Sequence, residues 1–212
     1  MFTGDEFGEG ADVISKTLQQ EKIKASFFLT GKFYKNPAFK KSIQQLVSAG
    51  QYMGAHSDQH LLYCDWLNRD SLLVSKKQFD NDLDANYKAM SRFGIKKTNA
   101  KYFLPPYEWY NDSISKWTLE KGLQLVNYTP GTLSHADYTN ANDNNYRSSE
   151  QILQSILNYE ASHSSGLNGF ILLMHIGAGP GRTDKFYSKL PELIKHLKQK
   201  NYQLLRIDEL LK

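Results

Sequence analysis

Two histidines four residues apart, His56 and His60, have the residue type and the spacing to bind a metal ion. On one helical turn, residues i and i+4 share a face, so both imidazoles can point at the same divalent cation. A third ligand is available near the amino terminus, where Asp5 and Glu6 follow the short segment Met-Phe-Thr-Gly. We therefore predict a divalent-metal site built from the histidine pair and an amino-terminal carboxylate.

The residues around the pair limit the kind of metal site. A His-Glu-x-x-His protease motif carries its general base directly after the first histidine, and this chain has Ser57 there. Gly54, two residues upstream of the pair, predicts a loop that opens into a short helical turn. The alternative is a surface turn that carries two polar histidines without a metal. Cys64 follows closely, and it is expected to be a small buried hydrophobic residue rather than a ligand.

Composition places the chain among ordinary globular proteins. It has 212 residues, of which 40% are hydrophobic and 23% charged, and this is enough for one domain with a substantial core. The net charge of +4 is spread over helix-like stretches, which predicts a solvated face and no nucleic-acid partner. A single cysteine excludes an internal disulfide. The aromatic content of 13% is high enough for sugar-stacking surfaces.

The first residues lead straight into a motif-like segment. The sequence contains no signal peptide and no apolar run of membrane-spanning length, so no membrane span is expected. Met1 and Phe2 leave too little chain for a full first strand. We expect a truncated first strand and a missing upstream segment, in which case the protein would be secreted or periplasmic; the sequence itself assigns no location.

Helical and strand patterns alternate along the chain, which is typical of an α/β protein with a largely parallel sheet. Helical periods cover residues 12–22, 39–49, 79–93, 112–121, 149–160 and 190–200, and strand-like runs cover residues 25–29, 52–55, 100–104, 124–128, 169–174 and 202–206. Six or seven β/α units without a linker predict one barrel domain over residues 1–212. Barrel chemistry lies where strands end. Five residues follow predicted strands and would ring one mouth: Asp5, His56, Pro105, Thr129 and His175.

Five segments, in order along nearly the whole chain, resemble motifs of the polysaccharide deacetylases of carbohydrate esterase family 4. Thr3-Gly-Asp-Glu6 is similar to the first motif, Thr-Phe-Asp-Asp, and Ala25-Ser-Phe-Phe-Leu-Thr-Gly31 is similar to the strand after it. Gly54-Ala-His-Ser-Asp-Gln-His60 resembles the metal-binding His-Ser-x-x-His motif. Phe103-Leu-Pro-Pro-Tyr107 resembles Phe-Arg-Pro-Pro-Tyr, and Ile171-Leu-Leu-Met-His175 resembles Ile-x-Leu-x-His. The resemblance implies a distorted (β/α)7-type barrel.

By this resemblance the protein is a metal-dependent hydrolase that removes N- or O-linked acetyl groups from a carbohydrate. The resemblance implies that the metal is held by Asp5, His56 and His60. Zinc is the first candidate, with cobalt, nickel or manganese as the others, because imidazole and carboxylate suit several first-row ions. Such an ion lowers the pKa of bound water and polarises the acetyl oxygen.

The resemblance also implies roles for residues outside the metal site. His175 would be the general acid that protonates the leaving group, and a backbone amide at Tyr107 would share the oxyanion charge. Leu173 would line the pocket for the acetyl methyl group. Beside what the resemblance implies, Pro106 and Trp109 are candidates for contacts with the acetylated carbohydrate.

Two departures from the family motifs concern the catalytic base. Leu104 stands where the family has an arginine that orients the base, and no Asp-Trp motif is recognisable near Asn127-Tyr-Thr-Pro-Gly-Thr132. One register of the first motif makes Asp5 the base and Glu6 the metal ligand. The other makes Asp5 the ligand and places Gly4 at the base position. We favour the second, since a missing carboxylate leaves the arginine without a partner.

In that register a substitute base is needed, and Glu6 or Glu108 would supply it, unless either is only a solvated carboxylate. Trp109, with the adjacent Tyr110, is either a sugar-stacking platform or packing at the barrel rim. The remaining candidates, in the glycine-rich loop after His175, either orient groups at the mouth or are loop surface: Arg182 and Asp184.

Three function classes remain open. The first is an active metal-dependent carbohydrate deacetylase, which we favour. The second is a catalytically impaired relative that binds metal and glycan without turnover, supported by Gly4 and Leu104. The third is a metal-dependent amidase acting on a non-sugar amide, because related barrels adapt their loops freely.

Overall fold

The computed structural model describes residues 1–212 and divides into two compact units. Unit 1 contains Met1–Ala25 and Tyr128–Lys212, and unit 2 contains Ser26–Asn127. The interpretation of residues 1–212 as one domain is not tested by this division and stays a prediction.

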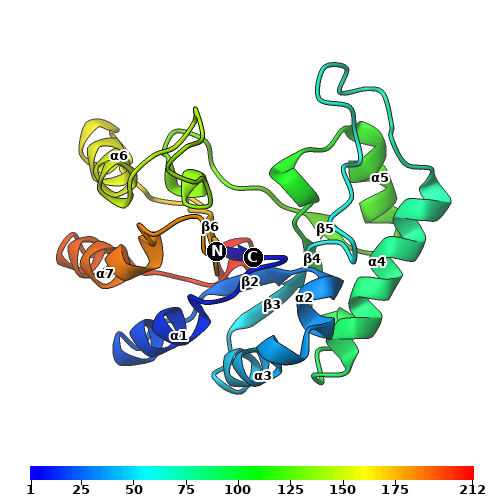
Figure 1. Ribbon diagram of the computed structural model, residues 1–212, viewed down its shortest axis with the longest axis horizontal. Helices are drawn as coiled ribbons and strands as arrows, with labels where there is room; N and C mark the ends of the chain where they lie inside the picture. The colour runs from blue at the N-terminus through cyan, green and yellow to red at the C-terminus, as the bar shows by residue number, and fades with distance from the viewer. The chain divides into compact units, whose positions relative to one another are not determined.

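Unit 2 is built on parallel strands covered by helices (Figure 1). Its strands pair in the order β5-β4-β3-β2, and every pairing is parallel. The strands are β2 (Ser26–Leu29), β3 (Tyr52–Ala55), β4 (Tyr102–Phe103) and β5 (Gln124–Leu125). The helices are α2 (Gly31–Lys35), α3 (Lys40–Ser48), α4 (Lys76–Ser91) and α5 (Asp112–Glu120), with 3₁₀ turns η1 (Pro37–Phe39), η2 (Lys97–Asn99) and η3 (Pro106–Glu108).

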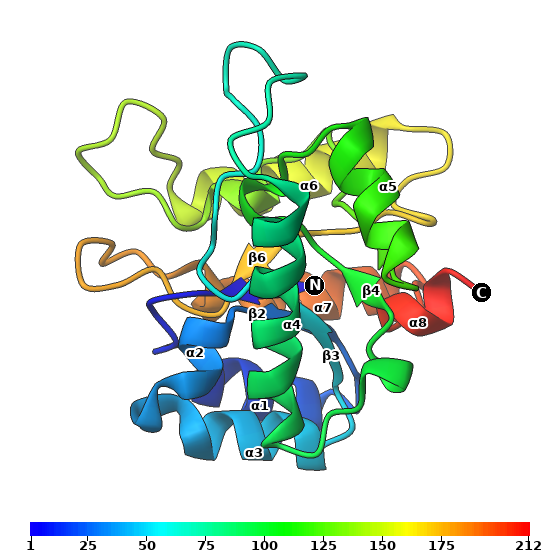
Figure 2. The same cartoon turned by 90° about the vertical axis from the view of Figure 1, so that its right-hand side faces the viewer.

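Local sequence explains why the elements of unit 2 form where they do. All residues of β2 and β3 are buried, as expected for parallel strands covered on both faces. A Cβ atom at Gly54 would lie 2.4 Å from a ring carbon of Phe28, so only glycine allows the two strands this packing. A capping box of Ser75 and Gln78 starts α4, which Figure 2 shows side-on.

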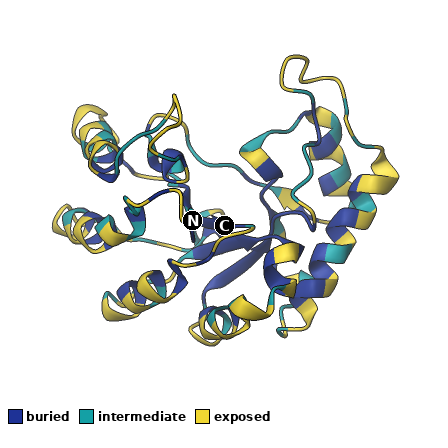
Figure 3. Cartoon of the chain, in the orientation of Figure 1, coloured by how far each residue is buried: buried dark blue, intermediate teal, exposed yellow.

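Unit 1 contains a second pair of parallel strands and four helices. β1 (Phe2–Gly4) pairs with β6 (Met174–His175) through Phe2 with Met174 and Thr3 with His175. The helices α1, α6 and α7 each have a buried and an exposed side (Figure 3). The helices are α1 (Ala11–Gln20), α6 (Ser149–Ser162), α7 (Leu190–Gln199) and α8 (Ile207–Leu210), with 3₁₀ turns η4 (Ser134–Ala136) and η5 (Phe186–Lys189).

The structure corrects several predicted elements. The apolar run 169–174 is a strand only at Met174–His175, because Ile171 donates its N–H to the Thr129 side-chain oxygen, 3.0 Å away, instead of joining a regular ladder. No strand forms over residues 202–206. The five-residue helix α2 was not predicted; its N-cap is Thr30, whose side chain accepts the Phe33 N–H. None of the helices has the length and apolar character that crossing a membrane requires.

Candidate active site

The imidazoles of His56 and His60 lie together in unit 2, just beyond the end of β3. Their ring centroids are 5.0 Å apart, with the ring planes at 66°. His56 is 2% exposed, and its Nδ1 lies 2.8 Å from the carbonyl oxygen of Leu104. A carbonyl only accepts hydrogen bonds, so Nδ1 carries the proton and the lone pair is on Nε2. This is the orientation that a backbone carbonyl gives to a metal-binding histidine.

The turn that carries the pair is held by a buried carboxylate of α4. Asp82 accepts hydrogen bonds from the Ser57 hydroxyl at 2.6 Å and from the N–H groups of Asp58 and Gln59 at 3.0 and 2.9 Å. The turn is not the short helix that the sequence predicted, since Ser57 and His60 have φ angles of 70° and 56°. Asp82 thus fixes the backbone from which both imidazoles project.

Two further contacts stabilise the same turn. Gly31, at the start of α2, donates its N–H to the Ser57 carbonyl, and a Cβ there would lie 1.8 Å from a side-chain oxygen of Asp58. The Tyr63 hydroxyl lies 3.3 Å from Asp82. Burial, and then the negative charge of Asp82, hold the pKa of Tyr63 well above its usual value, so its hydroxyl remains a neutral donor.

The histidine pair fits two positions of a zinc-like site. Two converging imidazoles, one of them oriented by a carbonyl, are typical donors for such an ion. Neither unit by itself contains three grouped His, Cys, Asp or Glu side chains. The candidates for the third ligand, Asp5 and Glu6, follow β1 in unit 1, where Asp5 is half-buried and Glu6 is exposed. Their participation stays a prediction from the sequence.

The loop after β4 brings an aromatic ring against this pair. Leu104, Pro105 and Pro106 are buried, and the next two residues, Tyr107 and Glu108, have φ angles of 59° and 54°. Two consecutive left-handed residues other than glycine are rare, and such backbone is concentrated at functional sites. The Tyr107 ring is 45% exposed and lies 4.4 Å from the His60 ring, centroid to centroid.

In unit 1, His175 ends β6 and is paired with a buried carboxylate. Its Nδ1 lies 2.6 Å from one oxygen of Asp137, and its backbone N–H donates to the other at 2.9 Å. Asp137 is 4% exposed and follows η4. The Tyr138 ring packs 5.0 Å from the imidazole. This carboxylate fixes the ring of His175 and directs Nε2 as the nitrogen that can exchange a proton.

Sequence reasoning missed Asp137. Its signal was an acidic residue followed by an aromatic one, Asp137-Tyr138, shortly after the segment 127–132 in which an Asp-Trp motif was sought. His135, just before it, stacks on Tyr128 with centroids 4.9 Å apart. Burial, reinforced by nearby His175 and opposed by Asp137, lowers the pKa of His135. The close histidine partner of Asp137 is His175, whose Nδ1 lies 2.6 Å from the carboxylate.

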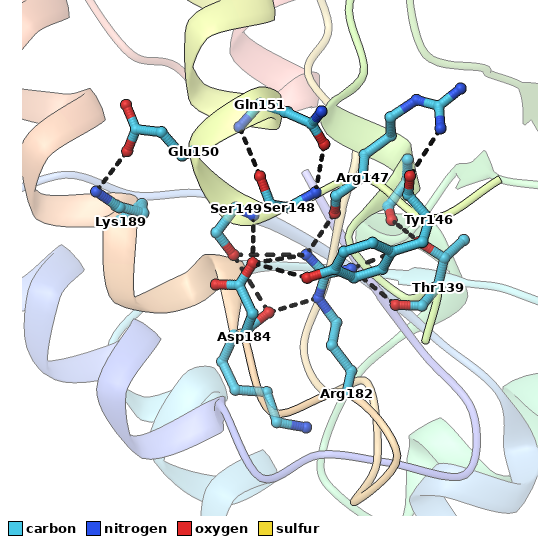
Figure 4. Close-up of polar contacts among 12 residues, drawn as sticks. Thr139, Tyr146, Arg147, Ser148, Ser149, Glu150, Gln151, Arg182, Asp184 and Lys189 are labelled. Carbon is cyan, nitrogen blue, oxygen red and sulfur yellow. Dashed lines mark hydrogen bonds and ion pairs between the residues drawn. The ribbon is translucent and has the colours of Figure 1, made fainter. Parts of the chain in front are cut away.

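Arg182 ties the loops around this dyad together (Figure 4). Its guanidinium is buried and donates to the carbonyls of Asp184 at 2.6 Å, Thr139 at 2.7 Å and Arg147 at 2.9 Å. The side chain of Asp184 accepts the first N–H of α6, from Ser149. Arg182 is therefore an internal anchor, and one of its acceptors, Thr139, lies two residues after Asp137. Its interpretation as loop surface is wrong, since it is 1% exposed.

The remaining predicted residues lie in different settings. Leu173 is fully buried beside β6, and Pro106 is buried in unit 2. Trp109 is half-buried and donates its indole N–H to the Asp65 carbonyl at 3.2 Å. The carbonyl of Glu108 accepts from the Asn127 side chain at 2.8 Å. Cys64 is fully buried, as expected of a small hydrophobic residue.

The chain is similar in sequence to a curated protein. A bifunctional xylanase/deacetylase from Pseudobutyrivibrio xylanivorans is 28% identical over 196 residues, which cover 91% of this chain but only 27% of that protein. The chain therefore spans about a quarter of the length of the curated relative it matches.

Solved structures with low sequence identity share the fold. A peptidoglycan N-acetylglucosamine deacetylase has a TM-score of 0.75 at 19% identity, over 99% of this chain and 86% of that one. A CE4 family pseudoenzyme from Bacillus anthracis has a TM-score of 0.71 at 20% identity, over 100% of this chain and 65% of that one. These likenesses confirm the predicted α/β fold with a parallel sheet, of the distorted-barrel kind found in CE4 deacetylases.

The family model for polysaccharide deacetylases matches residues 4–126. This match covers more than half of the chain and includes the histidine pair, the turn that carries it and the Pro-Pro-Tyr loop. The chain is therefore a member of the polysaccharide deacetylase family, carbohydrate esterase family 4.

Proposed function

We propose that this protein is a metal-dependent hydrolase that removes acetyl groups from a polysaccharide or oligosaccharide. The observation that carries the proposal is the pair His56 and His60, in which the Leu104 carbonyl orients one imidazole for metal binding through Nε2. The His175–Asp137 dyad adds a positioned proton donor. Neither feature is needed for a purely structural role.

The ligands of the metal would be His56, His60 and, from the amino-terminal segment, Asp5. A divalent cation held there, zinc being the first candidate, supplies Lewis-acid chemistry that polarises the acetyl carbonyl and makes a water molecule more acidic. Imidazole and carboxylate donors suit this group of ions, including cobalt, nickel and manganese.

The other site residues act on the substrate directly. His175 gives a proton to the leaving amine or alkoxide, and Asp137 keeps its Nδ1 occupied so that Nε2 faces the reaction. The N–H of Tyr107 donates to the oxygen that gains negative charge. Leu173, Pro106 and Trp109 line the acetyl group and the sugar.

A carboxylate must take the proton of the attacking water. Glu6 is our first candidate, because Asp5 is used as the ligand and Gly4 stands at the usual base position. Glu6 is exposed, so its carboxylate is charged without a burial cost. Glu108, on the strained Tyr107–Glu108 loop, is the second candidate.

Acetate release tests the proposal. The substrates are acetylated xylan, suggested by the xylanase/deacetylase relative, and N-acetylglucosamine oligomers, suggested by the peptidoglycan deacetylase. We expect release from at least one substrate in the presence of zinc or cobalt, and loss of release in His175→Ala. Release of amine from non-sugar amides, with none from glycans, would instead identify an amidase.

A catalytically impaired relative is the second candidate function. Leu104 cannot form the ion pair that an arginine would make there, and Gly4 offers no carboxylate. The likeness to a CE4 family pseudoenzyme supports this alternative as a real outcome for the fold. Tight metal binding by His56 and His60 with no acetate release from any of these substrates would favour it.

A further inference from the structure

Residues 63–73 form a hairpin between β3 and α4 that no function above uses. Figure 2 shows this segment projecting beyond the amino-terminal end of α4. Cys64 and Leu72 form an antiparallel bridge, and the Leu73 N–H donates to the Tyr63 carbonyl at 2.9 Å. Asp65 accepts the N–H groups at the tip of the hairpin, from Leu67 and Asn68, both at 2.8 Å. These bonds give the hairpin a defined shape.

Side chains tie the hairpin to the segment before α5. Arg69 donates to the carbonyl of Tyr110, and its own carbonyl accepts from the Asn111 side chain at 3.0 Å. The Arg69 guanidinium lies over the Trp109 ring, 4.3 Å from its centroid. Trp109 is therefore occupied on one face by the cation and at its N–H by Asp65. These two contacts support the hairpin.

Trp66 is the exposed ring of this cluster. Its side chain is 53% exposed, whereas Trp109 is half-buried. The Trp66 ring lies 5.5 Å from Tyr107, and Tyr107 lies 4.4 Å from His60. The ring centroids of Trp66 and His60 are therefore separated by no more than the sum of these two distances. A continuous aromatic path connects the proposed site of chemistry to the hairpin.

The aromatic and polar side chains exposed on the hairpin indicate the class of ligand that this surface binds. Large aromatic rings held in fixed positions bind flat apolar faces, and neighbouring polar groups bind hydroxyls. Asn68, Arg69 and Asp70 follow Trp66 in the hairpin and are exposed. Leu67 and Leu73 are the other exposed apolar side chains of the hairpin, at 99% and 50%. Together with Trp66 and Tyr107 they are four side chains, whereas a stable protein interface takes about 20 to 30 residues from each partner. A sugar ring, with an apolar face and polar edges, matches both features.

We propose that Trp66 is a sugar-binding platform for a residue of the glycan chain that flanks the acetylated residue, and that it makes the protein selective for oligomers over monosaccharides. This inference rests on the proposed deacetylase function for its site of chemistry. It assigns the hairpin 63–73 as the specificity-determining segment of unit 2.

The test compares Trp66→Ala with Trp66→Phe on N-acetylglucosamine and xylan-type oligomers of increasing length. We expect kcat/KM to rise with length in the unaltered protein. Trp66→Ala should lose about tenfold on the longest oligomer, through KM, with the shortest substrate unchanged, as for the loss of one aromatic contact. Trp66→Phe should keep most of the gain. Leu119→Ala, at a 73% exposed leucine of α5 outside the hairpin, is the matched control and should have no effect.

Binding measurements separate this inference from the proposed function. In a His56→Ala background, which removes turnover, calorimetric titration with the longest oligomer should still detect binding that Trp66→Ala weakens about tenfold. If the unaltered protein releases no acetate but this binding difference persists, the deacetylase proposal fails and the platform stands. If Trp66→Ala changes neither length dependence nor binding, or affects all lengths equally, the platform is wrong.

Discussion

The imidazoles of His56 and His175 differ in the hydrogen-bond partner of their Nδ1 atoms. In unit 2, His56 donates its Nδ1 hydrogen to the neutral carbonyl of Leu104. In unit 1, His175 places its Nδ1 against the carboxylate of Asp137. A neutral acceptor orients a ring without favouring its positive charge, whereas a carboxylate stabilises the charge that a ring acquires during proton transfer. The neutral carbonyl beside His56 therefore suits a metal-binding imidazole, and the carboxylate beside His175 suits a general acid.

The backbones that carry the two rings also differ. His60 lies in a turn with left-handed residues that the carboxylate of Asp82 holds through backbone N–H groups. His175 ends the two-residue strand β6, which pairs in parallel with β1. A metal ligand placed on an irregular turn depends on that turn's hydrogen bonds, while a strand residue depends on its side-chain partner. Loss of the Asp82 hydrogen bonds would therefore displace His60 in unit 2, whereas loss of the Asp137 carboxylate would displace the imidazole of His175 in unit 1.

The largest expected effect is on metal binding in unit 2. His56→Ala or His60→Ala should abolish bound metal and acetate release together, because one imidazole and a carboxylate are a poor ligand set for a zinc-like ion. Metal content of the purified variants checks this. His163→Ala, at an exposed histidine of unit 1, is the control and should keep both properties. Full metal occupancy in His56→Ala would contradict the ligand assignment.

The next effect concerns the dyad in unit 1. Asp137→Asn keeps the size of the side chain but removes the charge that faces His175, and kcat should fall about 100-fold or more, as for loss of general acid catalysis. Metal content should be unchanged. In steady-state kinetics over a range of pH, the part of the kcat profile that reports ionisation of the general acid should be lost in this variant. An equal effect on metal binding would mean that Asp137 acts on the fold rather than on the proton.

The third effect is on stability. Arg182→Met leaves one buried and two part-buried carbonyls without their charged donor, and the free energy of unfolding should fall by about 3 kcal/mol. Denaturant unfolding measures it. Arg92→Met, at an exposed arginine in unit 2, should change stability by less than about 0.5 kcal/mol. Equal stability of the two variants would show that the Arg182 contacts are not formed in solution.

The smallest expected effect is a pH dependence of the free energy of unfolding, caused by Asp184 in unit 1. Burial alone would raise the pKa of Asp184, but hydrogen bonds from Ser149 and Tyr146 hold it below its usual value. An acid with a lowered folded pKa adds stability above its unfolded pKa of about 3.9, and this stability is lost as the pH falls through the folded value. Thermal unfolding of Asp184→Asn against the unaltered protein should differ by about 0.5 kcal/mol at neutral pH, after solvent screening, and the difference should shrink as the pH falls through the folded pKa of Asp184.

The sequence alone predicted the parts of the molecule that depend on local patterns. The helices α1, α3, α4, α5, α6 and α7 follow from hydrophobic periodicity, and the histidine pair and the Pro-Pro-Tyr loop follow from short motifs. The helix α2 was missed because five residues are too few for a period, although the Thr30 cap was a usable signal.

Long-range contacts account for the features that sequence reasoning missed. Asp82 lies within a helix and Asp137 after a 3₁₀ turn, and nothing nearby in the sequence pairs them with Ser57 or His175. The run 169–174 has the composition of a buried strand, but the Thr129 side chain takes the place of a strand partner at Ile171. Propensity describes what a segment favours, while its partners decide what it forms.

The most direct test of the difference between the two histidines is the metal affinity of His56→Ala and His175→Ala, measured side by side by titrating the metal-free proteins with zinc. Our account predicts that His56→Ala binds no zinc at the site, whereas His175→Ala binds one ion with the affinity of the unaltered protein while its acetate release falls. Unaltered zinc affinity in His56→Ala, or lost affinity in His175→Ala, would contradict it.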